Sequence, residues 1–195
     1  MTSSTQTHPT LKLTYFDITV GRGEITRLAL TIADIPFEDE RVSFADWPAL
    51  KPRMPFRQLP VLTVDGDTLT QDVAIARYAG TLAGLYPSAN PLDAARVDEI
   101  VLAVEDIRAL LYGLLKIPED DRHATGEAIS ATTLPAALGL LDARLTATSK
   151  GSRYHLANDV LSMADLDVYA IVALIKSGWL AGISTTAADV FPKLS

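Results

Sequence analysis

The chain has 195 residues, of which 48% are hydrophobic and 21% charged, so it is expected to bury a sizeable core. Its formal net charge of −7 argues against nucleic acid or an anionic membrane as a partner, because like charges repel. The sequence has no cysteine, which excludes disulfides, thiolate metal sites and a cysteine nucleophile. The three histidines, His8, His123 and His155, lack metal-ligand spacing, so we predict no metal.

The first part of the chain predicts an α/β domain over residues 11–84. Leu11, Leu13 and Tyr15 alternate with more polar neighbours, which is typical of a strand. Asp65-Gly66 is a strong signal for a tight turn between two strands. The predicted elements, in chain order, are a flexible polar tail (1–10), a strand (11–16), a helix (24–33), a strand (37–42), an irregular segment (43–59), a hairpin of two strands (61–64 and 68–70) and a helix (73–82).

The second part of the chain predicts an all-α domain over residues 92–195, after a proline-containing linker at 85–91. Only helical periodicity appears beyond the linker, with helices expected over 91–116, 134–145 and 162–177. Ser162 and Asp165 have the spacing of a capping box at the start of the last helix. No segment is apolar for long enough to span a bilayer, and we predict a cytoplasmic protein.

Six motifs in register resemble the cytosolic glutathione transferases, most closely the tyrosine-type classes and among these the sigma class. The resemblance runs from Leu11 over nearly the whole chain, and it implies a thioredoxin-like domain that holds glutathione, followed by the all-α domain. The motifs are Leu13-Thr-Tyr-Phe16, Gly21-Arg-Gly-Glu24, Ala45-Asp-Trp-Pro48, Gln58-Leu-Pro60-Val-Leu62, Gln71-Asp72 with Ala74-Ile-Ala-Arg-Tyr78, and Val104-Glu-Asp-Ile-Arg108.

The resemblance assigns the thiol chemistry to Tyr15 and Arg22. From its position alone, Tyr15 is a strand aromatic of the core, and Arg22 is a solvated loop arginine. In the family, a tyrosine at the end of the first strand donates a hydrogen bond to the glutathione sulfur and stabilises the thiolate. Arg22 resembles the arginine that supports this anion in sigma-like enzymes. The substrate thus supplies the thiol that the protein lacks.

The remaining glutathione contacts are also implied by the resemblance. Trp47 and Lys51 match residues that bind the glycyl carboxylate through an indole N–H and an ammonium. Leu59-Pro60 resembles a cis-proline turn whose residue 59 pairs its backbone with the extended tripeptide, and Gln58 matches a side-chain contact to the same peptide.

Gln71, Asp72 and Asp106 match the family's contacts to the γ-glutamyl end. Asp106 resembles an aspartate that reaches across a homodimer interface to the partner subunit's site. Asp72 departs from the pattern, because relatives mostly have Ser or Thr there, next to a helix N-terminus that receives the α-carboxylate. We expect Asp72 either to face the ammonium of the tripeptide or to weaken binding.

The sequence indicates the electrophile pocket less clearly. Phe16, Ile18 and Tyr112 are candidates for it, although their positions alone favour a place in the core. Relatives continue beyond the position of Ser195 with another helix or so that borders this pocket, so we expect a more open pocket here. The predicted function is conjugation of glutathione, as co-substrate, to small hydrophobic electrophiles by a homodimer. The alternatives are a non-catalytic binding or structural relative and a sigma-type glutathione-dependent prostaglandin isomerase.

Overall fold

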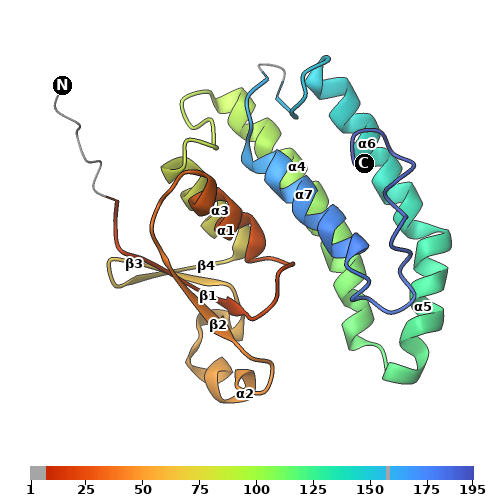
Figure 1. Cartoon of the computed structure of the whole chain (residues 1–195), viewed down its shortest axis with the longest axis horizontal. Helices are drawn as coiled ribbons and strands as arrows, with labels where there is room; N and C mark the ends of the chain where they lie inside the picture. The colour runs from red at the N-terminus through yellow and green to blue at the C-terminus, as the bar shows by residue number, and fades with distance from the viewer. Residues whose placement is uncertain (1–7, 157–158) are drawn as a thin grey trace. The chain divides into compact units, whose positions relative to one another are not determined.

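The computed structural model describes residues 8–156 and 159–195, so most of the predicted flexible tail lies outside the described residues. The chain divides into two units, Met1–Tyr86 and Pro87–Ser195, which are described in turn (Figure 1). The first is an α/β unit and the second is helical, and this architecture is that of the predicted thioredoxin-like and all-α domains.

The first unit is built on a four-stranded mixed sheet in the order β2-β1-β3-β4. Strand β1 (Leu11–Phe16) pairs parallel with β2 (Glu38–Val42) and antiparallel with β3 (Val61–Val64), which forms the predicted hairpin with β4 (Asp67–Thr70). The turn residues of this hairpin, Asp65 and Gly66, both have positive φ, the geometry that Asp-Gly favours.

Strand β1 lies inside the sheet, between β2 and β3, and has buried residues on both of its faces. Leu11, Leu13 and Tyr15 occupy one face of the strand, as their alternation predicts, and all three are buried. On the other face Thr14 is also buried, and its hydroxyl donates to the Glu40 carboxylate at 2.6 Å. The tyrosine is therefore presented by the most enclosed strand of the sheet.

Two helices, α1 (Glu24–Ile32) and α3 (Asp72–Leu82), pack against each other on one face of the sheet (Figure 1). The apolar spacing over 24–33 predicts a buried face of Ile25, Leu28, Ala29 and Ile32. Ile25 and Ala29 are buried, whereas Ile32 is exposed and Leu30, which is outside this face, is buried. The segment 43–59 contains a short helix α2 (Trp47–Leu50) and two 3-10 turns, η1 (Lys51–Arg53) and η2 (Pro55–Arg57).

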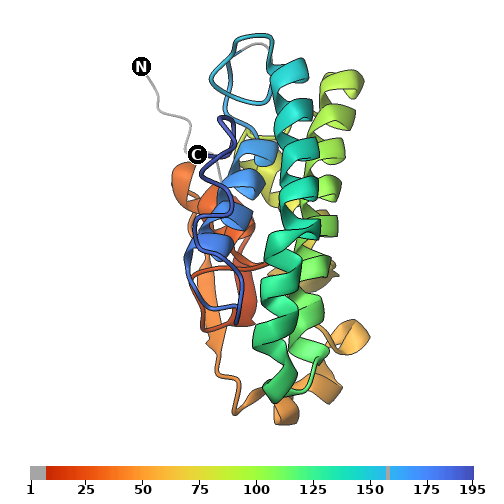
Figure 2. The ribbon, with the colours of Figure 1, turned by 90° about the vertical axis from the view of Figure 1, so that its right-hand side faces the viewer.

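The second unit contains the long helix α4 (Pro91–Gly113), which contacts both α6 (Thr133–Ser149) and α7 (Met163–Lys176) (Figure 2). Helix α4 ends three residues earlier than predicted and continues as a 3-10 turn, η3 (Leu114–Lys116). The predicted capping box at the start of α7 is present, and the Ser162 backbone N–H donates to Asp165 at 2.9 Å. None of the helices in the described residues is long and apolar enough to cross a membrane.

Helix α5 (Glu119–Ala131) is not predicted by the apolar periodicity. Gly126 is its only buried residue, so the helix has no apolar stripe from which the sequence could predict it. A Cβ at Gly126 would lie 2.0 Å from the carbonyl oxygen of Ala181. The helix is therefore docked through a close backbone approach that only glycine allows.

Candidate functional site

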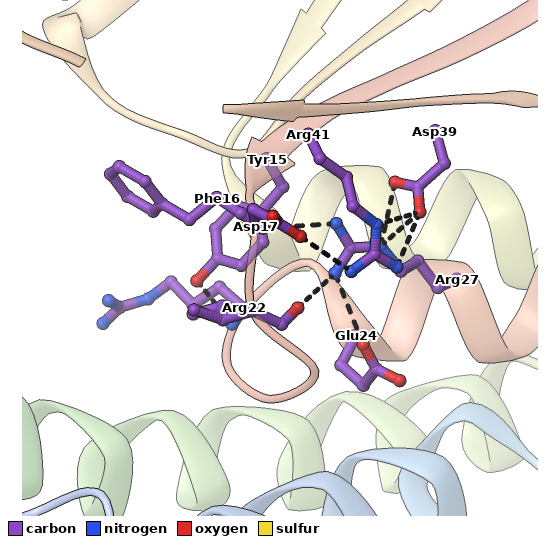
Figure 3. Close-up of polar contacts among 9 residues, drawn as sticks. Tyr15, Phe16, Asp17, Arg22, Glu24, Arg27, Asp39 and Arg41 are labelled. Carbon is purple, nitrogen blue, oxygen red and sulfur yellow. Dashed lines mark hydrogen bonds and ion pairs between the residues drawn. The ribbon is translucent and has the colours of Figure 1, made fainter. Parts of the chain in front are cut away.

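Tyr15 is the penultimate residue of strand β1; its ring is buried, and its hydroxyl contacts the loop that follows the strand. The ring belongs to a cluster with Val42, Leu59 and Val61, and only 4% of the residue is exposed. The backbone N–H of Arg22 donates to the Tyr15 hydroxyl oxygen at 3.0 Å (Figure 3). A phenol both accepts and donates, so this contact orients the hydroxyl without using its own hydrogen.

In the loop after β1, Gly23 packs directly against the ring of Tyr15. A Cβ at this position would lie 2.5 Å from Cδ1 of Tyr15, closer than side-chain atoms can approach. Its backbone is otherwise ordinary for any residue, with φ −78° and ψ −18°. Steric contact with the ring, and not backbone strain, therefore requires glycine here.

A buried arginine, Arg27 on α1, ties this loop to the sheet. Its Nε donates to both carboxylate oxygens of Asp39, at 2.9 and 3.1 Å, and Nη1 donates to the Ile18 carbonyl at 3.1 Å. Its guanidinium carbon lies 5.6 Å from the centroid of the Tyr15 ring, within the range of a cation–π contact. Figure 3 shows Arg27 between the loop and Asp39, which also pairs with Arg41 at 2.8 Å.

The sequence patterns do not predict Arg27 or Asp39 as site residues. The one signal available is that Arg27, a charged residue, lies among the apolar residues of the predicted helix 24–33. A buried guanidinium needs acceptors on several sides, and here they come from a helix, a loop and a strand.

Arg22 and Asp72 meet at the N-terminus of α3. The Nε of Arg22 lies 3.2 Å from Oδ2 of Asp72, which is the first residue of the helix. Gln71 precedes it with a positive φ of 70° and an exposed side chain. The structure thus brings three of the predicted site residues together. The backbone of Arg22 contacts the Tyr15 hydroxyl, and the Arg22 side chain pairs with Asp72.

Trp47 reaches the tyrosine through an aromatic relay. The centroid of its ring is 5.4 Å from that of Phe16, in an edge-on contact. The Phe16 ring in turn lies 5.5 Å from the Tyr15 ring, centroid to centroid, and stacks at 4.9 Å on the exposed ring of Phe44. Phe44 is not predicted as a site residue. Phe16 and Ile18 both pack against the cluster around Tyr15.

The other predicted residues of the first unit lie on the segment after α2. Lys51 and Gln58 are exposed, and Lys51 begins the turn η1. The peptide bond between Leu59 and Pro60 is cis, as the resemblance implies, and both residues are buried. Leu59 belongs to the cluster around Tyr15.

Asp106 and Tyr112 belong to α4 in the second unit. Asp106 is exposed and lines a groove between α4 and α6. The Tyr112 ring is 6.2 Å from the ring of Trp179, edge-on, which is a contact that no sequence pattern predicts because Trp179 follows α7 without periodicity. Within the described residues there is no group of three or more His, Asp or Glu side chains that could hold a metal ion.

The fold and the site define a class: a thioredoxin-like domain that presents a tyrosine at the end of its central strand, followed by a helical domain. The family model "Glutathione S-transferase, N-terminal domain" matches residues 11–81. Glutathione S-transferase 1 of Ascaris suum is 40% identical over 162 residues, which cover 81% of this chain and 76% of that protein. The chain therefore belongs to the glutathione S-transferase family.

Two further relatives show the range within the family. The hematopoietic prostaglandin D synthase of Rattus norvegicus is 33% identical and shares 90% of this chain and 85% of its own length. A crystal structure of a monomeric glutathione S-transferase from the hookworm Necator americanus matches with a TM-score of 0.77 and 32% identity, over 95% of this chain and 87% of that one.

Proposed function

We propose that the chain is a glutathione transferase that conjugates the thiolate of glutathione to small hydrophobic electrophiles. The observation that carries the proposal is the Tyr15 hydroxyl, which the Arg22 N–H contacts at 3.0 Å at the end of β1. A hydroxyl held in this way can donate its hydrogen to the sulfur of a bound thiol. Family membership supports the choice of glutathione as co-substrate.

The chemistry requires that a thiol be ionised at neutral pH. A free thiol has a pKa of about 8.5, and only the thiolate is a good nucleophile. A hydrogen bond to the anion lowers that pKa, and a shift of two units needs about 2.7 kcal/mol. One charge-assisted bond from Tyr15, with the positive charge of Arg22 nearby, can supply a stabilisation of this size.

We assign the rest of the tripeptide to residues on the same unit. Trp47 and Lys51 would bind the glycyl carboxylate, and Gln58 and the Leu59–Pro60 backbone the central peptide. Gln71 and Asp72 would meet the γ-glutamyl end. Support for these assignments comes from their motifs and from the aromatic contacts that connect Trp47 with Tyr15 through Phe16.

On the first unit, the electrophile would contact Phe16 and Ile18. Phe16 ends the strand that carries Tyr15, and Ile18 lies two residues beyond that end. An electrophile that reacts with a sulfur held by Tyr15 must approach this end of the strand. The apolar side chains of Phe16 and Ile18 fit a small hydrophobic reactant and not a charged one.

The first prediction concerns Tyr15→Phe, assayed with glutathione and chlorodinitrobenzene. Removing the hydroxyl removes the donor to the sulfur, so the apparent pKa in the pH profile of kcat/KM should rise by about two units and kcat/KM near pH 6.5 should fall roughly 100-fold. The two enzymes should converge above about pH 9, where an unassisted thiol is ionised.

Tyr78→Phe is the matched control, because it deletes a phenol hydroxyl on α3 of the same unit. It should leave the profile unchanged. If Tyr15→Phe were as fast as the wild type at every pH, the assignment of the sulfur ligand would be wrong. Wild-type protein that binds immobilised glutathione but turns over no electrophile would support the non-catalytic alternative.

The second catalytic candidate is a glutathione-dependent isomerase of prostaglandin endoperoxides, favoured by the similarity to the rat prostaglandin D synthase. In an isomerase glutathione is regenerated, and in a transferase it is consumed. Measuring glutathione consumption together with the products formed separates the two reactions.

We further propose that the protein acts as a homodimer in the cytoplasm. Dimers are typical of the family, although the hookworm relative is monomeric. A groove of about 450 Å³ between α4 and α6 includes Asp106 and is otherwise lined mainly by apolar side chains, such as Ile100 and Leu140. In a dimer, Asp106 of the partner subunit would complete the γ-glutamyl site.

A further inference from the structure

The ion pair at the N-terminus of α3 combines both charges that recognise an α-amino acid. Arg22 and Asp72 approach to 3.2 Å, and their side chains are 27% and 14% exposed. Both charged groups are therefore partly desolvated but remain open to a ligand. They lie on the same unit as Tyr15, and Arg22 contacts the tyrosine hydroxyl through its backbone.

A built-in carboxylate changes which ligand charge this helix end attracts. The N-terminus of a helix and an arginine both favour an anion. Asp72 already occupies this position and, by pairing with Arg22, offsets part of the positive charge there. A second carboxylate must share the arginine with Asp72 and is repelled by it, whereas an ammonium is attracted to Asp72.

We propose that Asp72 makes the α-ammonium of glutathione the group that this end of the site recognises, with Arg22 shared between Asp72 and the α-carboxylate. This inference rests on the proposed function, because it takes the γ-glutamyl group to lie at the start of α3. Asp72 is thereby a specificity-determining residue. It selects thiol peptides that carry a free amino group and gives little preference to those that carry only a carboxylate.

The test uses two analogues of glutathione that each lack one charge. Glutaryl-cysteinylglycine lacks only the ammonium, and 4-aminobutyryl-cysteinylglycine lacks only the α-carboxylate. Binding of both, and of glutathione, is measured by isothermal titration calorimetry. The protein has no cysteine, so these thiols cannot form mixed disulfides with it.

Wild-type protein should bind the aminobutyryl analogue on the order of tenfold or more tightly than the glutaryl analogue, the size expected for one charge-assisted contact against one like-charge contact. Asp72→Ser should reverse or abolish this preference, because the helix end and Arg22 then attract the carboxylate. Asp72→Glu keeps the charge and should keep the direction of the preference. Asp72→Asn serves in place of the serine variant if that protein does not fold.

Asp34→Asn is the matched control, since it removes the charge of an exposed aspartate at the end of α1 and should leave the preference unchanged. The inference is overturned if wild type and Asp72→Ser bind glutathione but show the same ratio between the two analogues. If wild-type protein binds none of the three thiols, the proposed function fails together with the inference.

Discussion

The backbone N–H of Arg22 and the missing side chain at Gly23 both help to position Tyr15. Its hydroxyl accepts from the Arg22 N–H, and its ring rests against Gly23, where no Cβ fits. Arg27 holds the start of the same loop through a hydrogen bond that its guanidinium donates to the Ile18 carbonyl. The position of the phenol therefore depends in part on Gly23 and Arg27, for which we propose no contact with a substrate.

The smallest change that tests this arrangement is Gly23→Ala. The new methyl group would overlap the Tyr15 ring, so either the ring or the loop must move. We expect a loss of about 1–3 kcal/mol in stability and a roughly 10- to 100-fold loss in kcat/KM from the displaced hydroxyl. Thermal unfolding and the conjugation assay measure the two effects.

Gly113→Ala makes the same chemical change where nothing lies within 4 Å of the added Cβ. It falls in a helix end with ordinary helical dihedrals, so it should be neutral or slightly stabilising. Equal effects of the two substitutions would show that the ring contact at Gly23 has no influence on Tyr15.

Between elements, the second unit is joined by a buried ion pair. Arg108 on α4 is 3% exposed and pairs with Asp167 on α7, which is 1% exposed, while Glu105 accepts from Arg108 at 2.9 Å. Burial alone would lower the pKa of Arg108, but the charges of Asp167 and Glu105 raise it overall, so the guanidinium stays charged. The contact fixes how the two helices pack.

Removing one partner should be costly. Asp167→Ala removes one of the two carboxylates that pair with the buried Arg108 guanidinium. We expect this variant to lose about 3–5 kcal/mol in the free energy of unfolding. Asp189→Ala removes the partner of Lys176 from an exposed pair and should cost less than about 1 kcal/mol. Urea denaturation of both variants checks the difference, and similar costs would mean that the buried pair contributes no more than a surface one.

At the scale of the whole molecule, the groove between α4 and α6 predicts association. Leu140 on its border is 75% exposed, which is a large apolar exposure next to an apolar groove. A second copy of the chain that covers this region would remove the exposed apolar area from water.

Light scattering should therefore give wild-type protein a mass of twice the 21.0 kDa of the chain. Leu140→Glu should shift the protein towards monomer by placing a charge in the interface. Val190→Glu, at a comparably exposed aliphatic residue that does not line the groove, should leave the mass unchanged. Wild-type protein that remains monomeric at micromolar concentrations would remove the proposed role of Asp106 in the partner subunit's site.

Much of the fold could be predicted because its signals are local. The alternation over Leu11–Phe16, the Asp-Gly turn and the capping box at Ser162 each depend on residues within a few positions of one another. Helix α5 could not, since it docks through Gly126 and has no apolar face to produce a periodic pattern. The exposure of Ile32 could not be predicted either, because the burial of a side chain depends on what its helix packs against.

The sequence by itself determined the order of the four strands and of helices α1 and α3 in the first unit, the absence of a protein thiol and, through six motifs in register, the family. Only the tertiary structure decided that Asp72 pairs with Arg22 and that Arg27 is buried under the loop beside Asp39. The pair of Arg22 and Asp72 joins residues fifty positions apart, and residues at this separation meet only when the sheet and its helices have packed. Local patterns cannot predict which charges such packing brings together.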